Sequence, residues 1–304
     1  MHRPRSLLRT ATAVLLSSVL LGACVTQAHG ASGVRRVRAG FAALGTHVPA
    51  PNASRVGVEA ALDGLDARMQ LATARAAESG ATISVLVLDR TTGRTISNGN
   101  NSEIATASVA KLFIADDTLY QASTEHGQLS PDDRTALDLM LQASDDDAGE
   151  AFWGRGGGDD IVARVASRYG LPSTGPGSDG RWWNTNTTAS DLARYYDMLL
   201  NGKGGLSLAA ANIIVDDLAQ SAPQGVDGYP QRFGIPDGLY AEPVAVKQGW
   251  MCCIGSDWMH LSTGVIGAER RYVMVIESLQ DGDDSTARNT ITDAVKTMFP
   301  NGRI

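Results

Sequence analysis

The chain has 304 residues, of which 43% are hydrophobic, 6% aromatic and 19% charged, as is typical of a globular protein with a substantial core. A formal net charge of -7 excludes general nucleic-acid binding, which needs a basic face, and the mixed composition excludes a disordered or collagen-like chain. The only lysines are Lys111, Lys203, Lys247 and Lys296, so a lysine inside an apolar segment requires an explanation.

The first residues are typical of a secretory signal. Three arginines (Arg3, Arg5 and Arg9) precede an apolar run at 11–23, which is shorter than the about 20 residues of a membrane span. The run ends in Leu21-Gly22-Ala23-Cys24, which resembles a bacterial lipobox, in which the cysteine is linked to diacylglycerol and becomes the N-terminus. The alternative is an ordinary signal peptide with an incidental cysteine.

From the lipobox we expect residues 1–23 to be a lipoprotein signal peptide and residues 24–54 to be a flexible tether. Lipid on Cys24 would then anchor the protein to the extracytoplasmic face of the cell membrane.

Hydrophobic periodicity predicts the elements of the globular part. Helical spacing indicates a helix over 56–77, and β-branched runs around a turn indicate a hairpin over 82–98. A largely apolar helix is expected over 107–121, followed by helices at 131–143, 145–153, 158–169, 188–201 and 206–219. Strands are expected at 240–247, 258–266 and 271–279, and a closing amphipathic helix at 284–298.

This order favours one α+β domain over residues 55–304, with a sheet built from both ends of the chain and helices inserted between them. We expect the sheet part at about 55–100 and 205–304, and the helical part at about 101–204.

One pair of residues in the helix over 107–121 indicates chemistry. Ser108 and Lys111 are three positions apart, so they share one face of a helix and the lysine nitrogen can reach the hydroxyl. In a dry site the lysine would lose its charge and become a base for the serine. This four-residue pattern is weak alone.

Two further segments change that assessment. Ser144-Asp145-Asp146 follows an apolar stretch and opens a helix, and Lys247-Gln248-Gly249 ends a predicted strand. In this order the segments resemble the S-x-x-K, S-D-N and K-T-G motifs of the penicillin-recognising serine enzymes, the class A β-lactamase and D,D-peptidase superfamily. The resemblance spans residues 56–299 approximately, and it includes the segments 87–93, 187–193 and 262–265. It suggests an actinobacterial-type lipoprotein whose second and third motifs are degenerate.

The resemblance implies a three-layer α/β/α fold with a five-stranded antiparallel sheet and an inserted all-helical subdomain. It also implies roles for the site residues. Ser108 would be the acylated nucleophile, Lys111 its base, Ser144 the proton shuttle, and the backbone N–H groups of Ser108 and Trp250 the oxyanion hole. The substrate-binding positions would be Asp146, Lys247, Gln248, Gly249 and Trp250, with Lys247 attracting a carboxylate and Gly249 leaving room for the substrate along the strand.

Structural explanations exist for single motifs. Ser144 and Asp145 are also common helix caps, and Lys247 would be unremarkable at the surface end of a strand.

The sequence also departs from the family pattern. Asp146 replaces an Asn, so it can only accept hydrogen bonds when ionised, and its charge favours the ammonium form of Lys111. An ion pair between these two residues would remove the base and leave a lipid-tethered scaffold with the shape of an enzyme. Gln248 replaces a Thr hydroxyl that meets the substrate carboxylate.

The Glu that activates the deacylating water in class A β-lactamases has no counterpart here. Between the second and third motifs, the glutamates are Glu150 and Glu242, neither of which lies in the corresponding loop. Asp179 is the acid of that loop, and a turn-forming role beside a glycine is favoured over a substitute base. We therefore expect weak deacylation.

Other candidate residues have simpler explanations. The adjacent Cys252 and Cys253 are interpreted as two reduced, partly buried residues rather than as a strained disulfide. His260 is interpreted as structural and Arg232 as a surface residue, while Trp182 and Trp183 either line the cleft or pack the loop. No metal site and no cofactor are indicated.

The leading hypothesis is a membrane-anchored serine hydrolase of β-lactamase or D,D-peptidase type, forming a Ser108 acyl-enzyme with β-lactams or D-alanyl peptidoglycan peptides. The alternative is an inactive lipoprotein of the same fold that binds a cell-wall peptide or an envelope partner. In both cases we expect a monomer.

Overall fold

The computed structural model describes residues 62–124 and 127–304. The predicted signal peptide, the tether and Cys24 lie outside the described residues and stay predictions.

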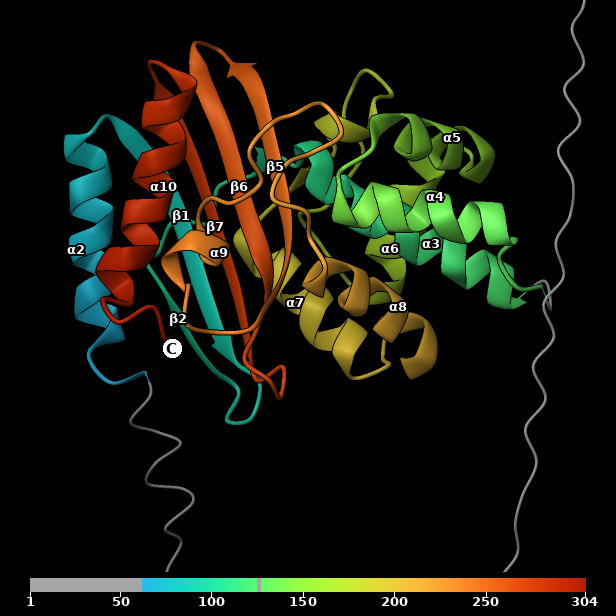
Figure 1. Ribbon diagram of the computed structural model, residues 1–304, viewed down its shortest axis with the longest axis horizontal. Coiled ribbons are helices and arrows are strands. Elements are labelled where there is room, and N and C mark those ends of the chain that lie inside the picture. Colours follow the sequence, from blue (N-terminus) through green and yellow to red (C-terminus); the bar gives the residue numbers. More distant parts are fainter. Residues whose placement is uncertain (1–61, 125–126) are drawn as a thin grey trace, which may run out of the picture. The chain divides into compact units, whose positions relative to one another are not determined.

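An antiparallel five-stranded sheet forms the middle layer, in the order β2-β1-β7-β6-β5 (Figure 1). Its strands are β1 (Ala81–Asp89), β2 (Arg94–Ser97), β5 (Val244–Ile254), β6 (Asp257–Ile266) and β7 (Tyr272–Asp281). Because β1 pairs with β7 along its whole length, the two ends of the described chain are joined in one sheet.

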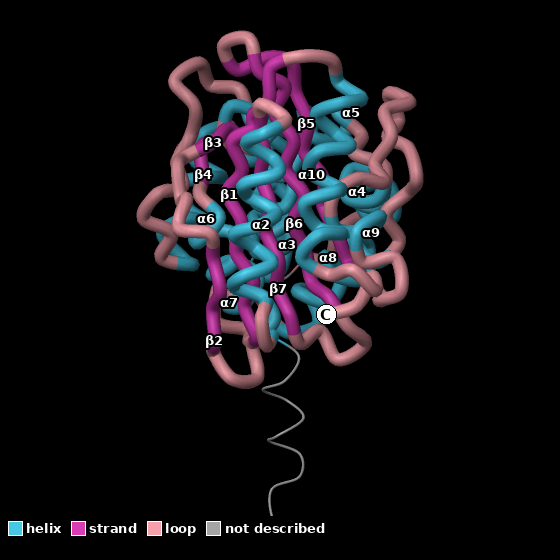
Figure 2. The backbone as a smooth tube through the Cα atoms, turned by 90° about the vertical axis from the view of Figure 1, so that its left-hand side faces the viewer, coloured by secondary structure: helices cyan, strands magenta, loops and turns pink. Residues whose placement is uncertain are grey.

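Helices cover both faces of this sheet. One face carries α2 (Leu65–Glu78), α9 (Ile235–Gly238) and α10 (Asp284–Met298), and Figure 2 views the sheet from this side. The other face carries α3 (Lys111–Thr124), α4 (Pro131–Gln142), α5 (Asp146–Gly156), α6 (Asp159–Tyr169), α7 (Ala189–Leu200) and α8 (Leu208–Ala219). The predicted three-layer α/β/α fold with a helical insertion is confirmed.

Each face of the sheet has its own apolar core, as expected for a layered domain. Val275 and Leu261 face the helical side with Phe113 of α3, whereas Ile276 and Val85 face α2 and α10. Alternation along each strand therefore supplies both cores.

The helix that begins at Lys111 is fixed by buried ion pairs. Asp116 and Asp117 of α3 lie inside the protein, and arginines of α6 reach them at 2.6 Å (Arg168 to Asp116, Arg164 to Asp117). Burial raises the pKa of Asp116 to about 6, although Arg168 opposes this shift. Because breaking such a pair leaves an unpaired buried charge, these contacts hold α3 and its first residue in place.

The structure corrects two predicted elements. Residues 107–110 form a short 3-10 helix, η2 (Ala107–Ala110), before α3 begins. The strand expected at 240–247 is instead β5, which continues to Ile254, because residues beyond the motif pair with β6. Four short elements were not predicted, since they are too short for periodicity: β3 (Ile104–Ala105), η3 (Trp182–Asn184), β4 (Asn186–Thr187) and α9.

Candidate functional site

Ser108 lies in η2 and Lys111 starts α3, so the two side chains meet one turn apart. Lys111 Nζ lies 3.0 Å from Ser108 Oγ, and both residues are buried. The residue before the serine, Ala107, has a φ of 44°, a conformation that costs a non-glycine residue energy. The backbone therefore holds Ser108 in a strained turn next to the lysine.

Lys111 donates to more than the serine. Its Nζ also lies 2.7 Å from the carbonyl oxygen of Ser144 and 2.5 Å from Asp146 Oδ1. Three acceptors around one amine use all three hydrogens of an ammonium and leave no free lone pair. Burial lowers the pKa of Lys111, and the charge of Asp146 opposes that shift.

The stem of Lys111 is confined as well. A Cβ on Gly149 would lie 3.1 Å from Lys111 Cε, and the lysine Nζ lies over the Trp182 ring, 4.6 Å from its centre. Gly149 and Trp182 thus pack against the Lys111 side chain, whose amine lies next to Ser108 and Asp146.

Asp146 is the first residue of α5. The cap of this helix is Asp145, whose side chain accepts from the backbone N–H of Ala148 at 2.6 Å, so the capping explanation holds for Asp145 and not for Ser144. The side chain of Asp146 is 72% exposed, whereas that of Lys111 is 0% exposed. One end of this ion pair is therefore buried and the other faces the cleft.

Ser144 and Lys247 form the second pair of the site. Lys247 Nζ lies 2.5 Å from Ser144 Oγ, and Ser144 has a φ of 58°. Burial and the nearby charge of Lys111 lower the pKa of Lys247 well below its ordinary value. The structure thus brings together Ser108, Lys111, Ser144, Asp146 and Lys247.

Gln248 does not reach the cleft. Its side chain is buried on the far face of β5 and donates to the carbonyl oxygens of Phe233 at 2.6 Å and Gln231 at 3.0 Å. The predicted contact with a substrate carboxylate does not fit this placement, because neighbouring residues of a strand face opposite sides.

Gly249 is needed for packing inside the protein, and the predicted room for a substrate stays a prediction. A Cβ at this position would lie 2.4 Å from the carbonyl oxygen of Thr106, so the missing side chain lets β5 pack against the turn that carries Ser108.

A cavity of about 200 Å³ opens in front of Ser108. Its wall includes Ser108, two carboxylates and three indoles, namely Asp146, Asp227, Trp182, Trp183 and Trp250. Sequence reasoning missed Asp227, because this residue lies in an irregular loop without a motif. Of the two interpretations of Trp182 and Trp183, lining the cleft fits this wall.

Both acids considered for deacylation are used elsewhere. Glu150 accepts from Trp182 Nε1 at 3.1 Å. Asp179 accepts from the backbone N–H of Arg181 at 3.2 Å and from Asn184 Nδ2 at 2.8 Å, as the turn-forming interpretation predicts.

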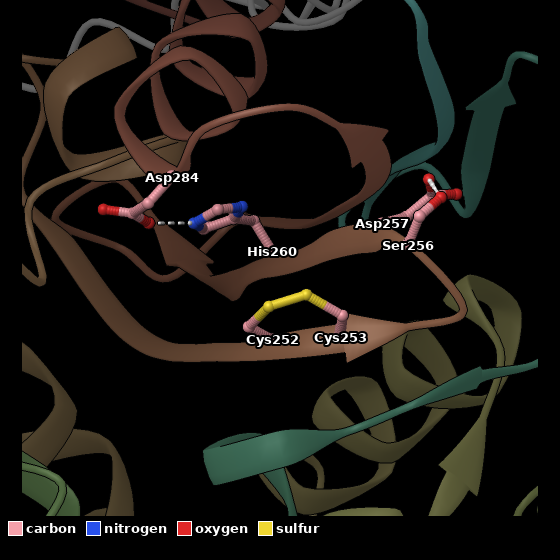
Figure 3. Close-up of a disulfide and its surroundings, with 6 residues drawn as sticks. All are labelled: Cys252, Cys253, Ser256, Asp257, His260 and Asp284. Atoms are coloured by element: carbon pink, nitrogen blue, oxygen red, sulfur yellow. Dashed lines mark hydrogen bonds and ion pairs between the residues drawn. A yellow bond between two sulfur atoms is a disulfide. The ribbon is translucent and has the colours of Figure 1, made fainter.

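The structure corrects the interpretation of the cysteines. Cys252 and Cys253 are bonded to each other and exposed near the end of β5 (Figure 3). His260, drawn in the same view, is buried with its Nε2 2.7 Å from the hydroxyl of Tyr229, and burial lowers its pKa to about 4. Arg232 is half-exposed and pairs with Asp237 at 3.0 Å, outside the cleft.

The described residues contain no group of His, Cys, Asp or Glu placed to hold a metal ion. Within 62–124 and 127–304, no helix has both the length and the apolarity to cross a membrane.

Comparison with known proteins finds curated relatives that are similar to most of this chain. Curated proteins of Mycobacterium bovis and Mycobacterium tuberculosis, named "Putative lipoprotein LppW", are 69% identical over 240 residues, 79% of this chain and 76% of each relative. The chain belongs to the LppW family. No protein-family model matches it.

Solved structures similar to this LppW-family chain share its fold. PBP-A has a TM-score of 0.63 at 18% identity, covering 79% of this chain and 96% of its own. The class A β-lactamase of Mycobacterium abscessus has a TM-score of 0.60 at 16% identity, covering 77% and 98%. At this identity the likeness establishes the β-lactamase fold and leaves activity to the site.

Proposed function

We propose that this LppW-family chain is a cell-envelope lipoprotein that binds a ligand in the cleft in front of Ser108 without hydrolysing it. The observation that carries the proposal is the ion pair between Lys111 Nζ and Asp146 Oδ1 at 2.5 Å. The name of the LppW relatives and the lipobox around Cys24 support the envelope location.

The ion pair acts against nucleophilic attack. For Ser108 to attack a carbonyl carbon, its proton must pass to a lone pair on the nitrogen of Lys111. That nitrogen lies within hydrogen-bond distance of Ser108, Ser144 and Asp146, an arrangement that matches the three hydrogens of an ammonium. An ammonium has no lone pair to accept the proton. Losing a proton would also leave the Asp146 carboxylate without its partner.

Two acids near the cleft, Glu150 and Asp179, have partners that oppose a role as the base for release of an acyl group. Glu150 and Asp179 are engaged by Trp182 and by the loop around Asn184. An acyl group that did form on Ser108 would therefore be hydrolysed slowly, since neither of these two acids is free to activate water.

The second candidate is a slow serine acyl enzyme that takes β-lactams or D-alanyl peptidoglycan peptides. The 3.0 Å contact between Lys111 and Ser108, and the strained backbone at Ala107 and Ser144, favour it. Among the similar solved structures, a mutant of PBP-A is an acyl-enzyme complex with penicillin G.

Intact-protein mass spectrometry after incubation with benzylpenicillin separates the two candidates. Ligand binding without acylation predicts an unchanged mass for the wild type at high penicillin concentration. A stoichiometric adduct that disappears in Ser108→Ala would establish the acyl enzyme instead, and its lifetime would report deacylation.

A further inference from the structure

The cavity in front of Ser108 has rigid aromatic walls. The ring of Trp250 stacks on that of Tyr229 with centres 4.5 Å apart, and the Tyr229 hydroxyl donates to Asp284 and lies 2.7 Å from His260 Nε2. Trp182 and Trp183, which also line the cavity, meet edge to face with ring centres 5.1 Å apart. These contacts hold the indole rings in place before any ligand arrives, which lowers the entropic cost of binding.

A cationic side chain of the protein lies over each of two of these indole rings. Lys111 Nζ lies 4.6 Å from the centre of the Trp182 ring, and the guanidinium of Arg181 lies 5.0 Å from that of Trp183. Arg181 is exposed at the rim and pairs with Asp179 at 3.7 Å. Both rings therefore lie at distances at which an indole attracts a cation.

The charged residues in the wall of the cavity are carboxylates. Asp146 is paired on its buried side with Lys111, and its side chain is 72% exposed toward solvent. Asp227 is exposed, and within the described residues its side chain accepts one hydrogen bond, from the backbone N–H of Tyr229 at 2.9 Å.

Asp227 lies beside an indole of the wall. A Cβ on Gly225 would lie 2.6 Å from Asp227 Oδ1 and 3.4 Å from Trp250 Cη2, so the carboxylate and this ring are neighbours. Lys111 and Lys247 are buried behind the wall and do not line the cavity. These lysines offset part of the carboxylate charge from behind. Inside the cavity a ligand meets the two carboxylates first, which favours a cation over an anion.

We propose that this cavity binds an organic ammonium group attached to a small apolar body. The inference rests on the proposed function, because it names the chemical class of the ligand that the cleft takes. Asp146 and Asp227 supply the charge, and Trp183 and Trp250 flank the apolar part of the cation, with the buried Trp182 behind them.

The test uses three probes of one shape: choline, its neutral isostere 3,3-dimethylbutan-1-ol and the anion 3,3-dimethylbutanoate. Binding to the purified protein from residue 25 onward is followed by NMR of the indole N–H signals, with Trp153 and Trp258 outside the cavity as internal references. A parallel titration with Nα-acetyl-lysine methylamide and its norleucine analogue distinguishes a peptide ammonium from a free quaternary one.

We expect the cation to bind about ten-fold more tightly than the neutral isostere, and the anion not at all. Asp227→Asn should remove most of this preference, whereas Asp147→Asn, an exposed acid in the same turn as Asp146 but outside the cavity, should keep it. Equal affinity for the three probes, or a preference that survives Asp227→Asn, would refute the proposal. The binding of these probes is measured without penicillin. A failed preference for the cation would therefore refute the ligand class, and a penicillin adduct would refute binding without hydrolysis.

Discussion

Replacing Asp146 with asparagine is the sharpest perturbation of the site. The substitution keeps the size of the side chain and removes the charge that lies 2.5 Å from Lys111 Nζ. In water, two unit charges at this distance attract each other by about 2 kcal/mol. The aqueous figure applies because the carboxylate side chain is 72% exposed.

Losing about 2 kcal/mol of ammonium stabilisation lowers the barrier to proton transfer from Ser108 by up to that amount. We therefore expect benzylpenicillin to acylate Asp146→Asn up to about 30-fold faster than the wild type, so that an adduct accumulates in the variant while the wild-type mass is still unchanged. The assay is intact-protein mass spectrometry over time at fixed penicillin concentration.

Two controls accompany this variant. Asp147→Asn removes a neighbouring exposed charge that does not contact Lys111, and it should leave the mass unchanged. The double variant Ser108→Ala with Asp146→Asn should form no adduct. If Asp146→Asn folds normally and is acylated no faster than the wild type, the ion pair does not keep Ser108 inactive.

Three other predictions concern stability and covalent state. Burial raises the pKa of Glu277 from 4.5 to about 8, so the folded state keeps a proton that the unfolded state loses, and stability falls as pH rises through this interval. Glu277→Gln should abolish that fall and raise the free energy of unfolding in urea by about 4 kcal/mol at pH 8; unchanged pH dependence would contradict this. Gly249→Ala places a Cβ 2.4 Å from the Thr106 carbonyl oxygen and should cost about 2 kcal/mol, a loss that wild-type stability would disprove. Cys252 and Cys253 should resist iodoacetamide until a reductant is added, and labelling without one would show that they are reduced.

Much of the fold could be predicted from the sequence, because its elements are long and periodic. The hairpin expected over 82–98 is β1 with β2, and the closing helix has the bounds expected, 284–298. The layered arrangement comes from the resemblance, since periodicity gives elements and not their order in a sheet.

The motifs brought the right residues to the site, but they did not determine where every side chain points. Gln248 faces the far side of β5 because the strand continues past the motif and alternates. Asp227 was missed because an irregular loop brings it to the cavity. The sequence indicates that an ion pair between Lys111 and Asp146 would remove the base, but whether this pair forms depends on distances that a sequence does not contain.

The protonation state of Lys111 tests most directly whether the ion pair keeps Ser108 inactive. The scarcity of lysine makes the measurement practical, because Lys111, Lys203, Lys247 and Lys296 give few signals in an NMR spectrum of ¹⁵N-labelled side chains. At neutral pH we expect Lys111 to be an ammonium whose hydrogens exchange slowly with water and whose nitrogen signal shifts in Asp146→Asn. A neutral amine at Lys111 in the wild type would contradict this inference, because Ser108 would then have the base that hydrolysis requires.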